Sequence, residues 1–198
     1  MQDLFPLFLK LEGRRCLVVG AGEISEPKIA SLLESKGIVG VVAPDGTRRV
    51  EGWARDGKIQ WHRREFNDSD LDDCFLVIVA TSPRELQQRI HRLARQRGVL
   101  CNVVDVPELC DFCYPAMVKR GALQIAISTG GESPALAQRL RKELEAHFGS
   151  EYEDWLAELG EARKRIRAEV ADGAAQKAQL HESASDKAFQ EFLKRRKK

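Results

Sequence analysis

Five short apolar segments, separated by segments of helix-forming composition, run through the first half of this chain. They read RCLVVG, IVGVVAP, IQWHR, FLVIVAT and VLCNVVD, at residues 15–20, 38–44, 59–63, 75–81 and 99–105. Three of them are almost entirely apolar, which is typical of strands that are buried on both faces of a parallel sheet. Helix-forming segments lie between them, at residues 23–35, 47–56 and 84–97. The alternation predicts the α/β class, with a doubly wound parallel sheet.

Composition and charge exclude several classes of protein. The net charge of +2 is too small to indicate a nucleic-acid partner, and the basic ending KRRKK is typical of a solvated helix end. No apolar run approaches the roughly 20 residues of a membrane-spanning helix, and the first residues lack the basic start of a signal peptide. The five cysteines follow no disulfide spacing. We therefore expect a cytoplasmic protein with neither a membrane nor a nucleic-acid partner.

A glycine-rich turn, Gly20-Ala21-Gly22-Glu23-Ile24-Ser25, follows the first predicted strand. In a dinucleotide-binding turn the first glycine permits the tight bend, the second lets the backbone approach a pyrophosphate, and the third position needs a small residue. Ser25 meets that need, and Pro27 falls in the first helical turn, where its missing N–H costs little. The turn predicts a nucleotide-binding, Rossmann-like domain, and the alternative is a purely structural corner.

The end of the second predicted strand bears on the choice of nucleotide. Asp45 lies where a carboxylate binds the ribose hydroxyls of NAD, and no arginine follows that strand immediately. The sequence therefore favours NAD over NADP, although Arg48 and Arg49 keep NADP open.

The alternation of apolar and helix-forming segments ends after Asp105. Residues 114–129 predict two short strands around the Arg120-Gly121 turn, and residues 133–148 predict a helix with Ser133 as its N-cap and Pro134 at its first position. From residue 150 onward we expect charged helices with breaks near Gly160 and Gly173. An intermittent apolar stripe there suits packing against another element or another subunit.

Two further features are candidates for chemistry. Asp105 ends the fifth predicted strand, at the sheet edge where ligands bind, and it either acts as a proton acceptor or only caps the turn before Pro107. STGGESP, residues 128–134, joins two glycines to a capped helix start. This segment is either a second anion-binding site or a plain corner.

Metal chemistry has little support in the sequence. Cys110 and Cys113 form a lone C-x-x-C motif. A zinc site would require two further ligands at a suitable spacing, and a redox site would require a thioredoxin-like context. We interpret both as buried small side chains. The four histidines form no cluster, so no metal site is predicted.

The stretch NVVDVPELCDFCYPAMVKRGALQIAISTGGESPALAQRLRKELE, residues 102–145, closely resembles the siroheme-synthase dehydrogenase family. Members of that family are precorrin-2 dehydrogenases, some of which are also sirohydrochlorin ferrochelatases. The similarity includes LFPLFLKLEGRRCLVVGAGE near the start, VVAP after the second predicted strand and FLVIVAT in the fourth. It covers about three quarters of the chain, and residues 150–198 contribute little to it.

The resemblance implies a reaction, an assembly and a division of the chain. NAD⁺ would oxidise precorrin-2 to sirohydrochlorin in siroheme or related tetrapyrrole synthesis. Residues 1–112 would form a Rossmann-like NAD-binding domain, residues 113–149 a small α+β dimerisation and substrate region, and residues 150–198 a helical C-terminal region. The protein would be a homodimer in which residues 114–148 cross to the partner.

The resemblance also assigns roles by position. The nucleotide contacts would be Gly20, Gly22, Glu23, Ile24, Pro44, Thr81 and Asn102, in addition to Asp45 above. Asp105 matches the essential acid, and Ser128 matches the serine beside the tetrapyrrole pocket. Because precorrin-2 is a polycarboxylate, we expect it to be bound by Ser128, Thr129, Gly130, Gly131 and Ser133.

Three residues depart from the family pattern, which usually has a basic residue at Pro27, an asparagine at Gln87 and no second cysteine at Cys113. The first two put details of the cofactor contact in question. Two alternative functions remain open: a bifunctional enzyme that also inserts iron, and a non-catalytic protein that binds NAD(H) or a tetrapyrrole.

Overall fold

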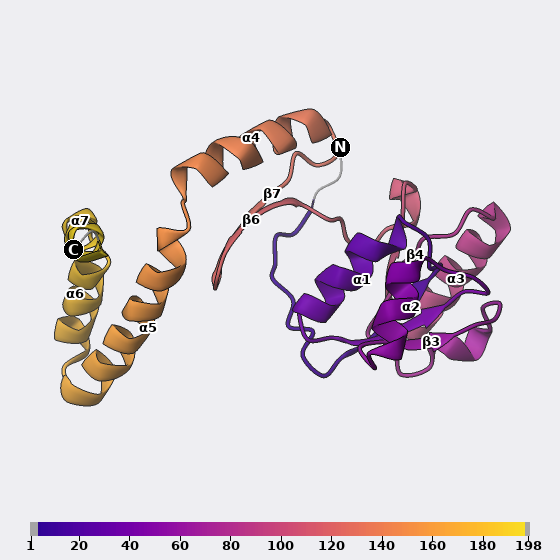
Figure 1. Ribbon diagram of the computed structural model, residues 1–198, viewed down its shortest axis with the longest axis horizontal. Helices are drawn as coiled ribbons and strands as arrows, with labels where there is room; N and C mark the ends of the chain where they lie inside the picture. Colours follow the sequence, from indigo (N-terminus) through magenta and orange to yellow (C-terminus); the bar gives the residue numbers. More distant parts are fainter. Residues whose placement is uncertain (1–3, 197–198) are drawn as a thin grey trace. The chain divides into compact units, whose positions relative to one another are not determined.

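The computed structural model describes residues 4–196, and these fall into two compact units, residues 4–113 and residues 114–196. Figure 1 shows the elements of both. Within the described part of the chain, no helix has both the length and the apolar character that crossing a membrane requires. The predicted division into residues 1–112, 113–149 and 150–198 stays a prediction.

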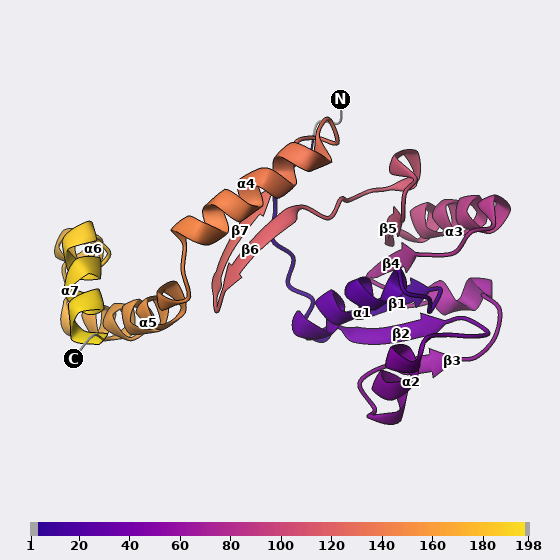
Figure 2. The same cartoon turned by 45° about the horizontal axis from the view of Figure 1, so that its top comes forward.

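The first unit is a five-stranded parallel sheet with helical crossovers. Its elements are β1 (Arg15–Val19), α1 (Ser25–Glu34), β2 (Ile38–Val42), α2 (Arg48–Arg55), β3 (Gln60–His62), β4 (Leu76–Val79), α3 (Arg84–Arg97) and β5 (Leu100–Val103). The strand order is β3-β2-β1-β4-β5, which Figure 2 shows from the side. The predicted α/β fold is confirmed, with each predicted strand and helix of this half of the chain. Two short 3₁₀ helices, η1 (Asp68–Leu71) and η2 (Pro107–Leu109), were not predicted.

Both faces of this sheet are covered, which explains why the strands are so apolar. On one face Val18, Val39 and Val41 pack against Ile29 of α1 and Val50 of α2. On the other face the core includes Leu17, Val77 and Val103 of the sheet, together with Ile90 and Ala94 of α3. A strand buried on both sides has no solvent face on which polar residues can alternate.

The strand order reverses at β1, and this reversal positions the candidate site. The chain leaves β1 through α1 toward β2, and it returns on the other side of β1 to form β4. The loops that follow β1 and β4 therefore diverge at the carboxyl edge of the sheet, where open α/β sheets bind their ligands.

The second unit begins with an antiparallel ribbon, β6 (Ala116–Arg120) and β7 (Leu123–Ile127), followed by α4 (Pro134–His147). The predicted cap of α4 is confirmed, because the hydroxyl of Ser133 accepts the Leu136 N–H at 3.2 Å and Pro134 is the first helical residue. The Arg120 guanidinium donates to the carbonyl oxygens of Phe148 and Glu145, at 2.8 and 3.1 Å. These bonds fasten the ribbon to the end of α4.

Three helices complete the second unit: α5 (Glu151–Glu169), α6 (Gly173–Ser183) and α7 (Asp186–Arg196). The aromatic rings of Tyr152 and Trp155 on α5 pack against Phe189 on α7, with ring centroids 4.8 and 4.5 Å apart. The predicted break near Gly160 is wrong, because α5 continues through this residue. A glycine inside a helix costs only about 1 kcal/mol, and the packing of the helix on both sides of Gly160 offsets that cost.

Candidate functional site

Gly20 makes the bend between β1 and α1. Its φ of +108° lies in a region that residues with a side chain rarely adopt, and its N–H donates to the Val42 carbonyl at 2.9 Å. A Cβ on this residue would collide with the carbonyl oxygen of Ala80. The bend therefore requires glycine for both conformation and space.

Gly22 and Ser25 lie at the N-terminus of α1. A Cβ at Gly22 would meet no atom within 4 Å, so the backbone is open to an approaching ligand there. Ser25 is completely buried, and among the described residues its hydroxyl is the buried side-chain oxygen without a hydrogen-bond partner. Pro27 lies in the first turn of α1, as predicted. An open glycine, an unpaired hydroxyl and a helix N-terminus together fit the diphosphate of a dinucleotide.

A cavity of about 50 Å³ lies at the carboxyl ends of β1 and β2. Its walls include Gly20, Pro44 and Thr81, three of the residues predicted to contact the nucleotide. Arg64 and Phe66 line it too. Sequence reasoning missed these two, because they follow the short strand β3 without a motif of their own.

Arg64 is held at this cavity by Asp70. Its guanidinium makes two hydrogen bonds to the carboxylate, at 2.6 and 2.8 Å. Burial raises the pKa of Asp70, but the bonds from Arg64 and from the Asn67 N–H more than offset this and leave the pKa below its ordinary value. The positive charge of Arg64 is thus matched within the protein.

Thr81 is held in place by Gln87 of α3. The buried Gln87 side chain donates to the Thr81 carbonyl oxygen at 2.6 Å, across the loop that follows β4. Gln87 is one of the departures from the family pattern, and its longer side chain has a structural role in this chain.

Asp45 and the glycine turn lie in neighbouring loops. Asp45 is exposed just after β2, and the next residues bond to the turn through the Thr47 N–H, which donates to the Ala21 carbonyl at 3.0 Å. A Cβ at Gly46 would lie 2.8 Å from the Ala21 side chain, so the two loops are in close contact. Glu23 and Ile24 are exposed in the turn itself.

Asp105 occupies a strained position just past the end of β5. The Val106 N–H donates to the Val103 carbonyl at 3.1 Å and closes a turn in which Asp105 has a φ of +61°. Its carboxyl group is exposed at the same sheet edge as the glycine turn. A left-handed conformation costs a residue other than glycine of order 1 kcal/mol, so the surrounding bonds must maintain it.

Lys28 of α1 adds a charge near Asp105. Burial lowers the pKa of the Lys28 ammonium, and the negative charge of Asp105 acts in the opposite direction. The two groups are thus close enough to interact electrostatically. Sequence reasoning missed this residue, because most lysines of amphipathic helices point into solvent and the sequence does not distinguish Lys28 from them.

Asn102 is buried in β5, where its side-chain nitrogen bonds within the protein. It donates to the Phe112 carbonyl at 2.8 Å and approaches the Cys110 sulfur at 3.4 Å. Contact with a nucleotide, which stays a prediction, would therefore use the amide oxygen.

In the second unit, the predicted anion-binding segment forms a turn at the start of α4. Gly130 and Gly131 have φ values of +61° and +88°. The hydroxyls of Ser128 and Thr129 accept the N–H groups of Gly130 and Ser133, both at 3.2 Å. The turn thus uses part of its N–H groups to stabilise itself, and its binding of an anion stays a prediction.

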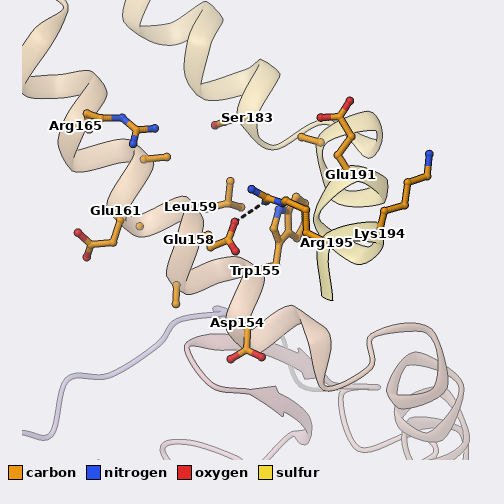
Figure 3. Close-up of a pocket in the computed structure, with 14 residues that line it drawn as sticks. Asp154, Trp155, Glu158, Leu159, Glu161, Arg165, Ser183, Glu191, Lys194 and Arg195 are labelled. Carbon is orange, nitrogen blue, oxygen red and sulfur yellow. Dashed lines mark hydrogen bonds and ion pairs between the residues drawn. The ribbon is translucent and has the colours of Figure 1, made fainter. Parts of the chain in front are cut away.

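A wider groove, of about 1190 Å³, lies between α5 and α7 (Figure 3). Trp155 and Leu159 line it, and the Arg195–Glu158 ion pair, at 2.9 Å, crosses it. None of the predicted site residues borders this groove.

The cysteines differ in burial from the prediction. Cys110 is half-buried, but Cys113 is exposed, so the interpretation of both as buried is wrong for Cys113. Cys113 lies at the end of the first unit, where the chain leaves the core. Among residues 4–196, no three His, Cys, Asp or Glu side chains gather as a metal site would require.

Comparison with known proteins gives matches along most of the chain. A family model described as "Putative NAD(P)-binding" matches residues 7–116, and one described as "Sirohaem biosynthesis protein central" matches residues 120–147. Siroheme synthase of Nitrosococcus oceani is 38% identical over 165 residues, which are 83% of this chain and 34% of that protein. Siroheme synthase of Thioalkalivibrio sulfidiphilus is 36% identical over 170 residues, which are 86% of this chain and 35% of that protein. The chain thus spans about a third of the length of these relatives.

A solved structure, SirC, precorrin-2 dehydrogenase, matches with a TM-score of 0.80 and 27% sequence identity. The match covers 97% of this chain and 98% of that chain. Both units are therefore present in a solved protein of similar extent.

Proposed function

The chain belongs to the siroheme-biosynthesis family of NAD(P)-binding proteins, and on this premise we propose that it oxidises precorrin-2 to sirohydrochlorin with NAD⁺. The observation that carries the proposal is the match to SirC, a precorrin-2 dehydrogenase, over nearly the whole of both chains. The siroheme synthases, which are much longer, support the pathway. The glycine turn and the exposed carboxylate of Asp105 supply the local chemistry.

The residues of the first unit have separate tasks in this reaction. The open backbone at Gly22 and the N-terminus of α1 bind the diphosphate, and Thr81, held by Gln87, borders the cavity beside it. When bound, NAD⁺ supplies the hydride acceptor. Oxidation of precorrin-2 removes one hydride and one proton, and the Asp105 carboxylate accepts the proton.

In the second unit, the turn from Ser128 to Ser133 binds carboxylates of the substrate. Its two glycines with positive φ leave the backbone near the start of α4 free of side chains. Positive ends of helix dipoles and exposed N–H groups favour anions, and precorrin-2 carries several carboxylates.

The reaction is tested by mixing the purified chain with NAD⁺ and precorrin-2 and recording the absorbance of NADH. We expect NADH to appear in step with sirohydrochlorin. If the protein binds both compounds and forms no NADH, it is a binding protein and the proposal fails. Adding Fe²⁺ to the same mixture tests the alternative of metal insertion, since siroheme would then form.

We also propose NAD as the preferred cofactor. Two of the arginines near the ends of β2 and β3 already have acidic partners: Arg49 pairs with Glu26 at 3.4 Å, and Arg63 pairs with Glu51 at 2.9 Å. Binding the 2′-phosphate of NADP through either of these arginines would require breaking its ion pair, and the phosphate would also be repelled by the nearby Asp45 carboxylate.

Replacing Asp45 with alanine is therefore expected to raise the KM for NAD⁺ and to leave the KM for NADP⁺ equal or lower. The loss of one or two hydrogen bonds to the ribose predicts a change of ~10-fold in the ratio of the two kcat/KM values. Steady-state kinetics with both cofactors measures it. An unchanged ratio would remove Asp45 from the nucleotide site.

We further propose a homodimer, and a cytoplasmic one, since an odd number of cysteines suits a reducing compartment. A two-stranded ribbon such as β6–β7 is marginal in water unless other elements cover it, and here α4 packs against it. On α4, Leu136 is 38% exposed, and Leu140 and Leu144 on the same side are only half-buried. Two-fold pairing would cover these side chains.

Leu136→Asp is expected to shift the protein from dimer to monomer, because a carboxylate would have to be desolvated in the interface. Light scattering across a dilution series measures the mass of both proteins. Leu4→Asp, at a residue of similar exposure in the other unit, is the control for a charge added to the surface. A wild-type protein that is monomeric and fully active would contradict the assembly.

A further inference from the structure

The loop that carries Asp105 is fastened to β5 at both ends. The chain leaves β5 at Val103 and returns alongside it at residues 110–112. The Asp111 N–H donates to the Cys101 carbonyl at 2.7 Å, and the Asp111 carboxylate accepts the Cys101 N–H at 2.9 Å. The Asn102 side chain donates to the Phe112 carbonyl at 2.8 Å. The returning segment is thus bonded to the edge of β5.

Between these fastenings lies the strained turn. Val103 and Val106 are its first and last residues, joined by the bond between the Val106 N–H and the Val103 carbonyl, and Asp105 precedes Val106 with its φ of +61°. The two central residues of this turn would not keep its conformation without further contacts. Whatever holds the two ends of the turn also sets the direction of the Asp105 carboxyl group.

Cys110 contacts both ends of this turn. Its sulfur lies 3.1 Å from the Val103 carbonyl oxygen and 3.3 Å from the Val106 carbonyl oxygen. The Asn102 side-chain nitrogen donates to the same sulfur at 3.4 Å. Burial raises the pKa of the Cys110 thiol. The thiol therefore keeps its proton at neutral pH, and this single proton is shared between the two carbonyl oxygens in a three-centre hydrogen bond.

We propose that Cys110 is a positioning residue for Asp105, whose thiol bridges the Val103 and Val106 carbonyls and so directs the carboxylate toward the substrate. This inference rests on the proposed function, in which Asp105 accepts the proton. It assigns a role to the first cysteine of the C-x-x-C pair that involves neither a metal nor a disulfide.

The test measures kcat and the KM for NAD⁺ in Cys110→Ala and Cys110→Ser. We expect Cys110→Ala to lower kcat about tenfold and to leave the KM for NAD⁺ unchanged, since one hydrogen bond that orients Asp105 is lost. Cys110→Ser keeps a donor at this position and is expected to retain kcat within about threefold. If Cys110→Ala does not fold, Cys110→Val replaces it, because valine fills the space and donates no hydrogen bond.

Cys74→Ala is the matched control. Cys74 is also half-buried, and its sulfur donates to a carbonyl oxygen, that of Asp70, at 3.2 Å. It precedes β4 and so lies at the opposite edge of the sheet from Asp105. We expect this variant to have the kcat of the wild-type protein.

A double-mutant cycle separates positioning from a general structural role. If Cys110 acts through Asp105, adding Cys110→Ala to Asp105→Asn causes no further loss of kcat. A tenfold loss in both backgrounds, or a wild-type kcat in Cys110→Ala, would overturn the inference and leave the proposed function standing. A wild-type kcat in Asp105→Asn itself would instead remove the proton acceptor, and the positioning role with it.

Discussion

Asp105→Asn is expected to lower kcat for sirohydrochlorin formation by ~10²-fold or more while the affinity for NAD⁺ stays unchanged. The amide has the shape of the carboxylate but cannot accept the proton that leaves precorrin-2. Asparagine also adopts the left-handed conformation that Asp105 has, at a φ of +61°, so the turn is preserved. The loss is therefore attributable to chemistry and not to folding.

Asp73→Asn is the control for this substitution. Asp73 is exposed, has a φ of +58°, and precedes β4, so it lies at the sheet edge opposite to Asp105. Steady-state turnover and calorimetric titration with NAD⁺ are measured for both variants. Turnover near the wild-type rate in Asp105→Asn would exclude this residue as the proton acceptor.

Gly22→Asp is expected to abolish NAD⁺ binding without unfolding the protein. A side chain at Gly22 enters open space, because a Cβ there meets no atom within 4 Å, and its φ does not lie in the left-handed region. The added carboxylate would then occupy and repel the approach of the diphosphate at the N-terminus of α1. Calorimetry measures the affinity, and thermal unfolding measures the stability.

Gly22→Asn separates charge from volume, since the amide has nearly the same size without the negative charge. We expect it to weaken NAD⁺ binding less than Gly22→Asp does. Gly20 cannot serve for this purpose, because a side chain there would collide with Ala80 and disturb the fold. An unchanged affinity in Gly22→Asp would disprove the proposed diphosphate site.

Much of the fold was predictable because its determinants are local in the sequence. The five apolar segments became the five parallel strands, and Ser133-Pro134 begins α4 as expected. The same holds for the glycine turn, where the φ of +108° at Gly20 is a local property of the backbone, although the collision of a Cβ with Ala80 adds a constraint from a distant residue. Gly160 is the counterexample, because packing along α5 outweighed the low helix propensity of a single glycine.

The supports of the site could not be predicted, because each joins residues that are distant in the sequence and have ordinary local surroundings. Lys28 of α1 lies near Asp105, and Arg64 lies at the cavity beside Gly20, although whole strands and helices separate the members of each pair in the sequence. Gln87 and Thr81 are only six residues apart in the sequence, but the bond from Gln87 to the Thr81 carbonyl still depends on how α3 packs on the sheet.

The sequence alone thus determined the succession of strands and helices along the chain and the position of the glycine-rich turn, since periodicity and backbone conformation are properties of short segments. Only the tertiary structure decided how Asp105 is held. The sulfur of Cys110 reaches the Val103 and Val106 carbonyls because the chain folds back against β5. Such a contact depends on the three-dimensional path of the chain, which no pattern in the sequence specifies.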